Sequence, residues 1–333
     1  MIEESLKNIQ NRLEGIQAGT YLHKRTNTIH VNDSFSSTSS TCLVAGKGFI
    51  DEYLIFPGIS ISYQSFIGNE IDFHHDALHS SLEINHCHKG RIGIHMKNNQ
   101  KVFLGEGDMA LQPMDCCADA DITLPLGFYE GIMITINLIE LEKNPPSFLA
   151  NEFATGKFHL DRFCNKSNPV ALTANHRIEH IFCELYQTPE EYKIPYMKLK
   201  VLELILFLCQ LKPDDENILN PYLSEQLEVI KSIHLKLTNN LNQRFTIEEL
   251  SSEYLMNATT LKNTFKSMYG LPIASYMKQY RIQAASNMLR ENNASIAEVA
   301  ASVGYESQGK FTKAFKELIG MSPTEFRKQY EIT

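Results

Sequence analysis

The feature that most constrains the fold is a helical pattern near the C-terminus that occurs twice, 49 to 50 residues apart. Each copy opens with a capping box, Thr246-x-x-Glu249 and Ser295-x-x-Glu298, in which side chains satisfy the free amides of a helix start. A glycine able to adopt a left-handed conformation closes each copy, at Gly270 and Gly320. Two copies are too few for a solenoid, so the sequence predicts a pair of helix-turn-helix units. The apolar positions match as Leu261 with Phe311, Phe265 with Phe315, and Tyr276 with Phe326.

Several segments of this region carry a resemblance to a known family. They are Arg281–Arg290 (RIQAASNMLR), Ile296–Tyr305 (IAEVAASVGY), Phe311–Lys316 (FTKAFK) and Gly320–Arg327 (GMSPTEFR). Together they resemble the DNA-binding domain of the AraC/XylS family of bacterial transcription regulators, over residues 225–330. In that family one long helix joins the two units, which here implies a helix from Ile273 to Arg290. Its length of ~27 Å is close to the ~34 Å between successive major-groove faces.

The resemblance also assigns the side chains that touch DNA. The N-terminal turns of a recognition helix face base edges, where Asn suits adenine, Lys suits guanine and a Thr methyl suits thymine. Gly309 departs from the family, because it removes one possible donor from the second unit. Lys266 and Lys316 alternatively belong to an ordinary solvated helix face. The base-reading candidates are Thr259, Lys262, Asn263, Gln308, Lys310 and Lys313, and the phosphate-holding candidates are Lys266, Ser307, Thr312 and Lys316.

Charge is divided unequally along the chain, which carries −8 overall. From Glu225 to Thr333 there are 13 Lys and Arg against 11 Asp and Glu, a net +2, while the remainder has 18 against 28, a net −10. The acidic N-terminal part argues against nonspecific coating of DNA or of an anionic membrane. DNA affinity must therefore depend on a few placed cations, helped by amide and hydroxyl donors.

The cysteines and the absence of apolar runs indicate a cytoplasmic protein. Seven cysteines, an odd number without framework spacing, fit buried thiols in a reducing compartment. Residues 1–20 do not resemble a signal peptide. The apolar stretch Val201–Leu211 is too short to cross a bilayer. A DNA-repair methyltransferase fused to such a reader is not expected, because its four-cysteine zinc site needs a spacing that Cys42, Cys87, Cys116 and Cys117 lack.

Residues 50–140 change to short alternating segments separated by turn residues, as in an antiparallel sandwich or barrel. The AraC family often carries a cupin-like barrel here that holds a small effector, and Gly105-Glu-Gly-Asp108 resembles that domain. The expected fold is α+β and multidomain. Before the barrel, residues 1–45 are expected to begin with a helix that carries Leu6, Ile9, Leu13 and Ile16 on one face. They are expected to continue through the Ser/Thr-rich stretch Asn32–Thr41 as a surface or poorly ordered arm. The expected strands are Ile59–Tyr63, Leu82–His88, Arg91–Met96, Lys101–Leu104, Met109–Gln112 and Tyr129–Ile136.

Histidines concentrate in the same region. His86 and His88 lie two apart, so on a strand they point the same way. Such a pair can ligate a divalent metal, but the remaining ligands of cupin enzymes are missing, so neither a metal nor another cofactor is expected. The two rings instead line an effector pocket or are hydrogen-bonded inside the barrel. The other histidines of the cluster are His74, His75, His79 and His95.

Two helices and a linker follow. Residues 174–188 show one apolar stripe, while Pro195–Leu211 is apolar almost all round, so it must pack on the barrel or on a partner chain. The polar, proline-bounded segment Pro213–Pro221 is the expected linker. The expected domains are 1–172 (barrel with arm), 173–212 (helical pair, possible homodimer contact), 213–222 (linker) and 223–333 (DNA-binding, with units 246–269 and 295–319).

These features predict a sequence-specific transcription regulator rather than an enzyme. Its expected partners are double-stranded DNA and, through the resemblance, RNA polymerase as the target of an activator. A small effector in the N-terminal domain is expected to gate it, which a coupling free energy between two modules allows. Two alternatives stay open: control by a protein partner without any ligand, and a metal-binding cupin enzyme fused to a DNA reader.

Overall fold

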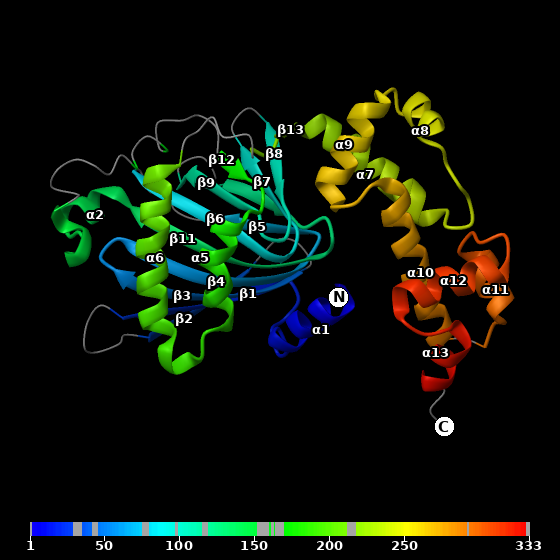
Figure 1. The fold of residues 1–333 in the computed structure, drawn as a ribbon, viewed down its shortest axis with the longest axis horizontal. Helices are drawn as coiled ribbons and strands as arrows, with labels where there is room; N and C mark the ends of the chain where they lie inside the picture. Colours follow the sequence, from blue (N-terminus) through cyan, green and yellow to red (C-terminus); the bar gives the residue numbers. More distant parts are fainter. Residues whose placement is uncertain are drawn as a thin grey trace. The chain divides into compact units, whose positions relative to one another are not determined.

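The computed structural model describes most of the chain and divides it into two compact units, Met1–Leu223 and Ser224–Thr333 (Figure 1). The described residues are 2–28, 35–41, 46–74, 80–96, 99–114, 119–151, 160, 163, 170–211, 218–291 and 293–330.

The N-terminal unit contains two sheets. Neighbouring strands are antiparallel, except that β1 and β3 run parallel. The larger sheet has the order β12 (Val170–Leu172), β9 (Met109–Pro113), β6 (Ser81–Gly90), β11 (Phe128–Asn137), β4 (Ile59–Gly68), β3 (Gly46–Phe56), β1 (Thr20–Asn27) and β2 (Phe35–Thr41). The smaller sheet has the order β13 (Tyr222–Leu223), β8 (Gln100–Leu104), β7 (Ile92–Met96), β10 (Asp119–Thr123) and β5 (Glu70–His74).

Two helices cover one face of the larger sheet, α5 (His176–Gln187) and α6 (Lys193–Gln210) (Figure 1). The shared core contains Ile134 of β11, Phe182 of α5 and Leu204 of α6, each 0% exposed. One side of the apolar helix α6 thus packs against the same chain. The opposite side leaves large apolar side chains in solvent: Tyr196, Leu199 and Leu206, which are 39%, 63% and 38% exposed. The short helices of this unit are α2 (Leu138–Lys143), η2 (Ser147–Leu149) and η3 (Glu190–Tyr192).

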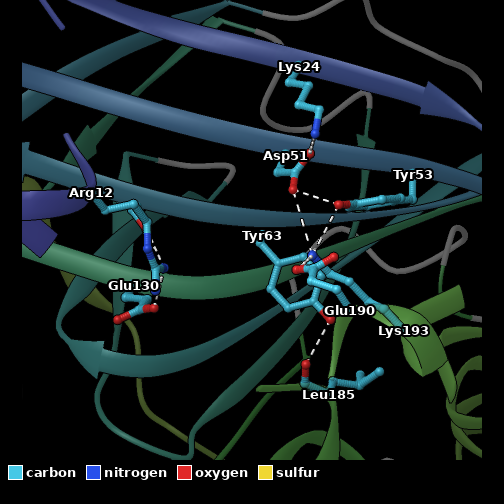
Figure 2. Close-up of polar contacts among 10 residues, drawn as sticks. Arg12, Lys24, Asp51, Tyr53, Tyr63, Glu130, Leu185, Glu190 and Lys193 are labelled. Atoms are coloured by element: carbon cyan, nitrogen blue, oxygen red, sulfur yellow. Dashed lines mark hydrogen bonds and ion pairs between the residues drawn. The ribbon is translucent and has the colours of Figure 1, made fainter. Parts of the chain in front are cut away.

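The half-buried ammonium group of Lys193 connects the start of α6 to the larger sheet (Figure 2). The Nζ atom of Lys193 lies 4.8 Å from the ring centroids of both Tyr53 and Tyr63. The same nitrogen donates to the Tyr53 hydroxyl at 3.0 Å and lies 3.7 Å from a carboxylate oxygen of Asp51. The Tyr63 hydroxyl in turn donates to the backbone oxygen of Leu185 at 2.8 Å. Both helices are therefore held to strands β3 and β4 by polar contacts as well as by apolar packing.

The N-terminal residues begin with the helix that Leu6, Ile9, Leu13 and Ile16 predict, but the strands after it differ from the expected arm. Helix α1 (Ile2–Arg12) packs on the larger sheet through Ile9, which is 1% exposed and clusters with Phe128 of β11. The guanidinium of Arg12 donates to Glu130 at 2.6 Å and to Ser65 at 3.3 Å (Figure 2). Strands β1 and β2 then extend the sheet. The prediction missed them because β1 is rich in half-buried polar residues and shows no clear apolar alternation.

The C-terminal unit is entirely helical among the residues that the structure describes. Both predicted capping boxes are confirmed, at Thr246–Glu249 and Ser295–Glu298. Gly270 and Gly320 end their helices in the left-handed conformation, with φ of 84° and 87°. The helices are α7 (Ser224–Asn239), α8 (Ile247–Glu253), α9 (Ala258–Tyr269), α10 (Ile273–Glu291), α11 (Ile296–Ser302), α12 (Gln308–Ile319) and α13 (Pro323–Tyr330).

The long helix α10 has a helix pair packed near each end, α8–α9 and α11–α12 (Figure 1). Its 19 residues give a rod of ~28 Å, as predicted from the sequence. Its C-terminal half contributes Ile282 and Leu289 to one core with Phe311 and Phe315 of α12. Phe265 of α9 is likewise 0% exposed. Each pair therefore has an aromatic residue at its centre.

A histidine lies in the aromatic cluster that joins α7 to α9 and α10. The ring of His234 stacks on Tyr269 at 4.3 Å, and its Nε2 lies 2.9 Å from the Tyr276 hydroxyl. Burial lowers the pKa of His234 from 6.5 to about 4. The packed ring is thus held in its neutral form.

Acid is expected to destabilise the C-terminal unit through this histidine. Between pH 6.5 and about 4, His234 is protonated in the unfolded chain but stays neutral in the folded one. The free energy of unfolding therefore falls as the pH falls. Urea denaturation of the full chain, followed by circular dichroism from pH 7 to 4, measures this loss. His234→Gln cannot titrate and should show a smaller fall; an identical pH dependence in both proteins would contradict the prediction.

Candidate nucleic-acid interface

The first candidate reading surface is the outer face of α9. Asn257 caps the helix, because its Oδ1 accepts a hydrogen bond from the Thr259 amide at 2.8 Å. The inward face carries Leu261 and Phe265, both 0% exposed. The helical period then turns the remaining positions outward. Four candidates lie exposed on that outer side: Thr259, Lys262, Asn263 and Lys266.

The second surface is the outer face of α12. Ser307 caps this helix and accepts from the Lys310 amide at 3.4 Å. Phe311, Ala314 and Phe315 point inward. The exposed candidates are Ser307, Gln308, Lys310, Lys313 and Lys316, while Thr312 is half-buried. The structure therefore brings the ten predicted residues together as two groups, one on each helix pair.

Most of the candidate cations are available for a ligand. Within the described part of the chain, no hydrogen bond or ion pair engages the ammonium groups of Lys262, Lys266, Lys313 and Lys316. Lys310 differs, because its Nζ lies 2.7 Å from a carboxylate oxygen of Glu306 one turn earlier. This pair is exposed, so it contributes little stability. It nevertheless means that Lys310 must exchange a protein carboxylate for any phosphate or base it meets.

The polar contacts around the two helix pairs hold them to the rest of the unit. Arg281 of α10 donates to the backbone oxygens of Leu241 and Gln243 at 3.0 and 2.6 Å. Arg327 of α13 donates to the backbone oxygen of Ala294. Lys278 of α10 and Glu317 of α12 form an ion pair of 2.7 Å. The loops that precede α8 and α11 are thus fixed to helices, which limits independent movement of either pair.

The N-terminal unit brings His86 and His88 together on β6, as the sequence predicts, but beneath α5. The His86 ring stacks on Phe182 at 4.1 Å, and its Nδ1 lies 3.0 Å from the Tyr186 hydroxyl. The His88 ring stacks on Tyr186 at 3.9 Å. Burial lowers the pKa of His86 to about 3, with a smaller contribution from His88. Both rings therefore serve at least to join the sheet to α5.

The opposite face of the same sheet carries a group of buried polar side chains that the sequence reasoning missed. The Glu83 carboxylate accepts from the amides of Asn85 and Gln112, the latter at 3.1 Å. Gln64 donates only at 3.5 Å to Ser62 and at 3.4 Å to the Met133 sulfur. The alternation Leu82, Glu83, Ile84, Asn85 is the signal that could have found this face, since its odd positions are polar. We call these residues the interior polar group: Ser62, Gln64, Glu83, Asn85 and Gln112, all 1–6% exposed.

Other expectations fall partly outside the described residues. These include His75, His79, Cys42, Cys116, Cys117 and residues 213–217 of the expected linker. In the described part of the chain, no three His, Cys, Asp or Glu side chains gather as metal ligands. The same part contains no helix long and apolar enough to cross a membrane. The rest of the expected linker contacts the N-terminal unit, because Ile218 pairs with Leu172 and the Leu219 amide donates to Ala171 at 2.7 Å.

Comparison with known proteins agrees with this geometry. Residues 250–329 match the family model described as a helix-turn-helix domain. The chain is 31% identical over 121 residues to the uncharacterized HTH-type transcriptional regulator YdiP of Escherichia coli K12, covering 35% of this chain and 40% of that protein. It is 37% identical over 84 residues to a candidate AraC-like transcription regulator of Streptomyces lividans, covering 25% and 28%. It is 27% identical over 108 residues to the transcriptional activator RhaR of Enterobacter sp. strain 638, covering 32% and 38%.

The helical unit and its two exposed faces place the chain in the class of proteins with a helix-turn-helix domain. Within that class, the chain carries the DNA-binding domain of the AraC/XylS family of transcription regulators, as the sequence resemblance indicated. This is a family of regulators and not of enzymes. The chain spans less than half the length of these three relatives.

Proposed function

We propose that the protein is a cytoplasmic, sequence-specific transcription regulator that reads DNA with two helix-turn-helix units, α8–α9 and α11–α12. The observation that carries this proposal is the repeated arrangement of exposed amide, hydroxyl and ammonium groups on the outer faces of α9 and α12. The length of the α10 rod, ~28 Å, is close to the ~34 Å of one duplex turn, which supports reading of two successive major grooves by one protomer.

In this proposal, contacts with bases and contacts with phosphates are made by different residues. Asn263 and Gln308 present amides suited to the N6 and N7 atoms of adenine, and Lys262 and Lys313 present ammonium groups suited to guanine. Thr259 offers a methyl group to thymine, and Lys310 joins the base readers after releasing Glu306. The remaining candidates hold phosphates and set the register: Lys266, Ser307, Thr312 and Lys316.

The salt dependence of DNA binding tests the proposal. Each ammonium group placed on a phosphate should contribute about 0.9 to the log–log slope of affinity against salt. We expect Lys266→Ala and Lys316→Ala each to lower that slope by about this amount on a mixed-sequence duplex, measured by fluorescence anisotropy of the full chain. Lys328→Ala, which removes an exposed lysine of α13, is the matched control. An unchanged slope in both variants would contradict the phosphate role.

We propose further that the two sheets of the N-terminal unit form a cupin-like barrel, and that a small effector binds in this unit. The interior polar group supports this, because burying polar side chains without full hydrogen bonding costs free energy. In the described part of the chain, the Gln112 Oε1 atom is buried and accepts no hydrogen bond. His86 and His88, the predicted pocket residues, lie on the other face of β6. Their contacts with Phe182 and Tyr186 would transmit a movement of β6 to α5.

We also propose that the exposed apolar side of α6 contacts a second copy of the chain, and that the regulator activates transcription by RNA polymerase. A relative named as an activator supports the second point, and Tyr196, Leu199 and Leu206 support the first. The native mass of the purified full chain tests both the effector and the dimer. A bound molecule adds its mass, and a homodimer doubles the total. A bare monomer at every concentration would instead favour control by a protein partner.

A further inference from the structure

Leu255, in the turn between α8 and α9, combines two unfavourable properties. Its side chain is 94% exposed, the most exposed large apolar residue among those described. Its backbone also adopts a left-handed conformation, with φ of 50°. Residues other than Gly, Asn and Asp seldom adopt this backbone conformation, because it brings the Cβ atom close to the following carbonyl oxygen. Leucine is thus a poor choice for this position on folding grounds.

The second helix pair shows what folding alone prefers at this position. After α8 the Met256 amide donates to the Ser251 oxygen at 3.1 Å, and after α11 the Tyr305 amide donates to the Ala300 oxygen at 2.9 Å. Both are the six-to-one bond of a Schellman cap, whose left-handed residue is usually glycine. In the second pair that residue is Gly304, with φ of 80°. Leu255 occupies the equivalent place in the first pair.

The position of Leu255 indicates what it contacts. It lies two residues before Asn257, the cap of α9, and so directly precedes the first turn of that helix, which carries Thr259. The other exposed large apolar residues of this unit are on other helices: Leu235 on α7, Tyr280 on α10 and Leu318 on α12. A protein interface needs a contiguous apolar core, whereas a single apolar side chain among amides and ammonium groups suits the edge of a DNA groove.

We propose that Leu255 is a specificity-determining residue of the first reading unit, whose side chain packs on the apolar edge of the DNA groove. Its partner is the methyl group of a thymine, which is the apolar group that the major groove presents. The contact rests on the proposed DNA-binding function and adds a residue outside the recognition helix. The folding cost of a left-handed leucine is then offset only in the complex with DNA.

The proposal predicts opposite effects of one substitution on folding and on binding. Leu255→Gly should raise the folding equilibrium constant about fivefold, because glycine accepts the left-handed conformation. The same substitution should weaken binding to the duplex that the full chain selects from a randomised pool, by about five- to tenfold. Binding to a mixed-sequence duplex should not change. Leu255→Met keeps an apolar side chain and should keep most of the affinity.

Urea denaturation and fluorescence anisotropy of the full chain measure the two effects. Replacing each thymine of the selected site by deoxyuridine tests the partner. The wild type should lose more affinity through this replacement than Leu255→Gly does, and an equal loss in both proteins would contradict the contact with a thymine methyl group. If Leu255→Gly binds the selected duplex as tightly as the wild type, the proposal is wrong. This holds even if Leu255→Gly activates transcription less well than the wild type, because that result would imply a protein partner for Leu255. If Asn263→Ala also leaves that affinity unchanged, the proposed DNA-binding function itself fails.

Discussion

Replacing Phe315 by alanine is expected to destabilise the C-terminal unit by about 3–5 kcal/mol, the cost of removing a buried phenylalanine ring. The ring is 0% exposed and packs against Phe311 and Phe326 at centroid distances of 5.5 and 5.4 Å. Because domains are stable by only about 5–15 kcal/mol, such a loss should unfold α11–α13 near physiological temperature. Phe265→Ala, in the equivalent place of the first pair, should cost a similar amount.

Circular dichroism of the full chain during urea denaturation measures this loss. Leu318→Ala on the same helix as Phe315 is the control, since Leu318 is 40% exposed and its truncation should cost well under 1 kcal/mol. A denaturation midpoint of Phe315→Ala equal to that of the wild type would show that the inward and outward faces of α12 are assigned the wrong way round.

Replacing Asn263 by alanine is expected to weaken binding by about 1–3 kcal/mol at a single base pair of the preferred site. The exposed amide lies on the outer face of α9, where a bidentate contact to adenine distinguishes that base from the others. Gln308→Ala should have the same effect at one base pair of the other half-site. In each variant, substitution of that base pair should cost no further affinity.

Anisotropy titrations against a series of single-base-pair substitutions make this measurement. Gln279→Ala, an exposed amide on the α10 rod, is the matched control and should leave the whole series unchanged. Equal weakening of Asn263→Ala on every duplex would mean that the amide holds a phosphate rather than a base.

The C-terminal unit could be predicted closely because its signals are local. A capping box such as Ser295–Glu298 needs only residues three positions apart, and Gly320 ends α12 through its own backbone freedom. The inward positions of Phe265 and Phe315 follow from the helical period alone. Within the same unit, the ion pair between Glu306 and Lys310 was missed, although its spacing of four residues is a recognisable helix-surface pattern.

The N-terminal unit was predicted less completely because its features depend on contacts distant in sequence. Gln112 approaches Glu83 only because β9 pairs with β6, and Lys193 reaches Asp51 only because α6 folds back on β3. The polar face of β6 also hides its own signal, since Glu83 and Asn85 look like solvent-facing residues of a one-sided sheet. His86 and His88 were correctly placed on one face, but nothing in their spacing identified α5 as the element that covers it.

Selection of duplexes from a randomised pool by the full chain tests most directly whether the two helix-turn-helix units, joined by α10, both read the same DNA duplex. We expect two short preferred elements with centres about 10–10.5 base pairs apart, the spacing of one helical turn. Asn263→Ala should relax one element, and Gln308→Ala the other. Recovery of no preferred sequence, or of a single element altered equally by both variants, would contradict the account.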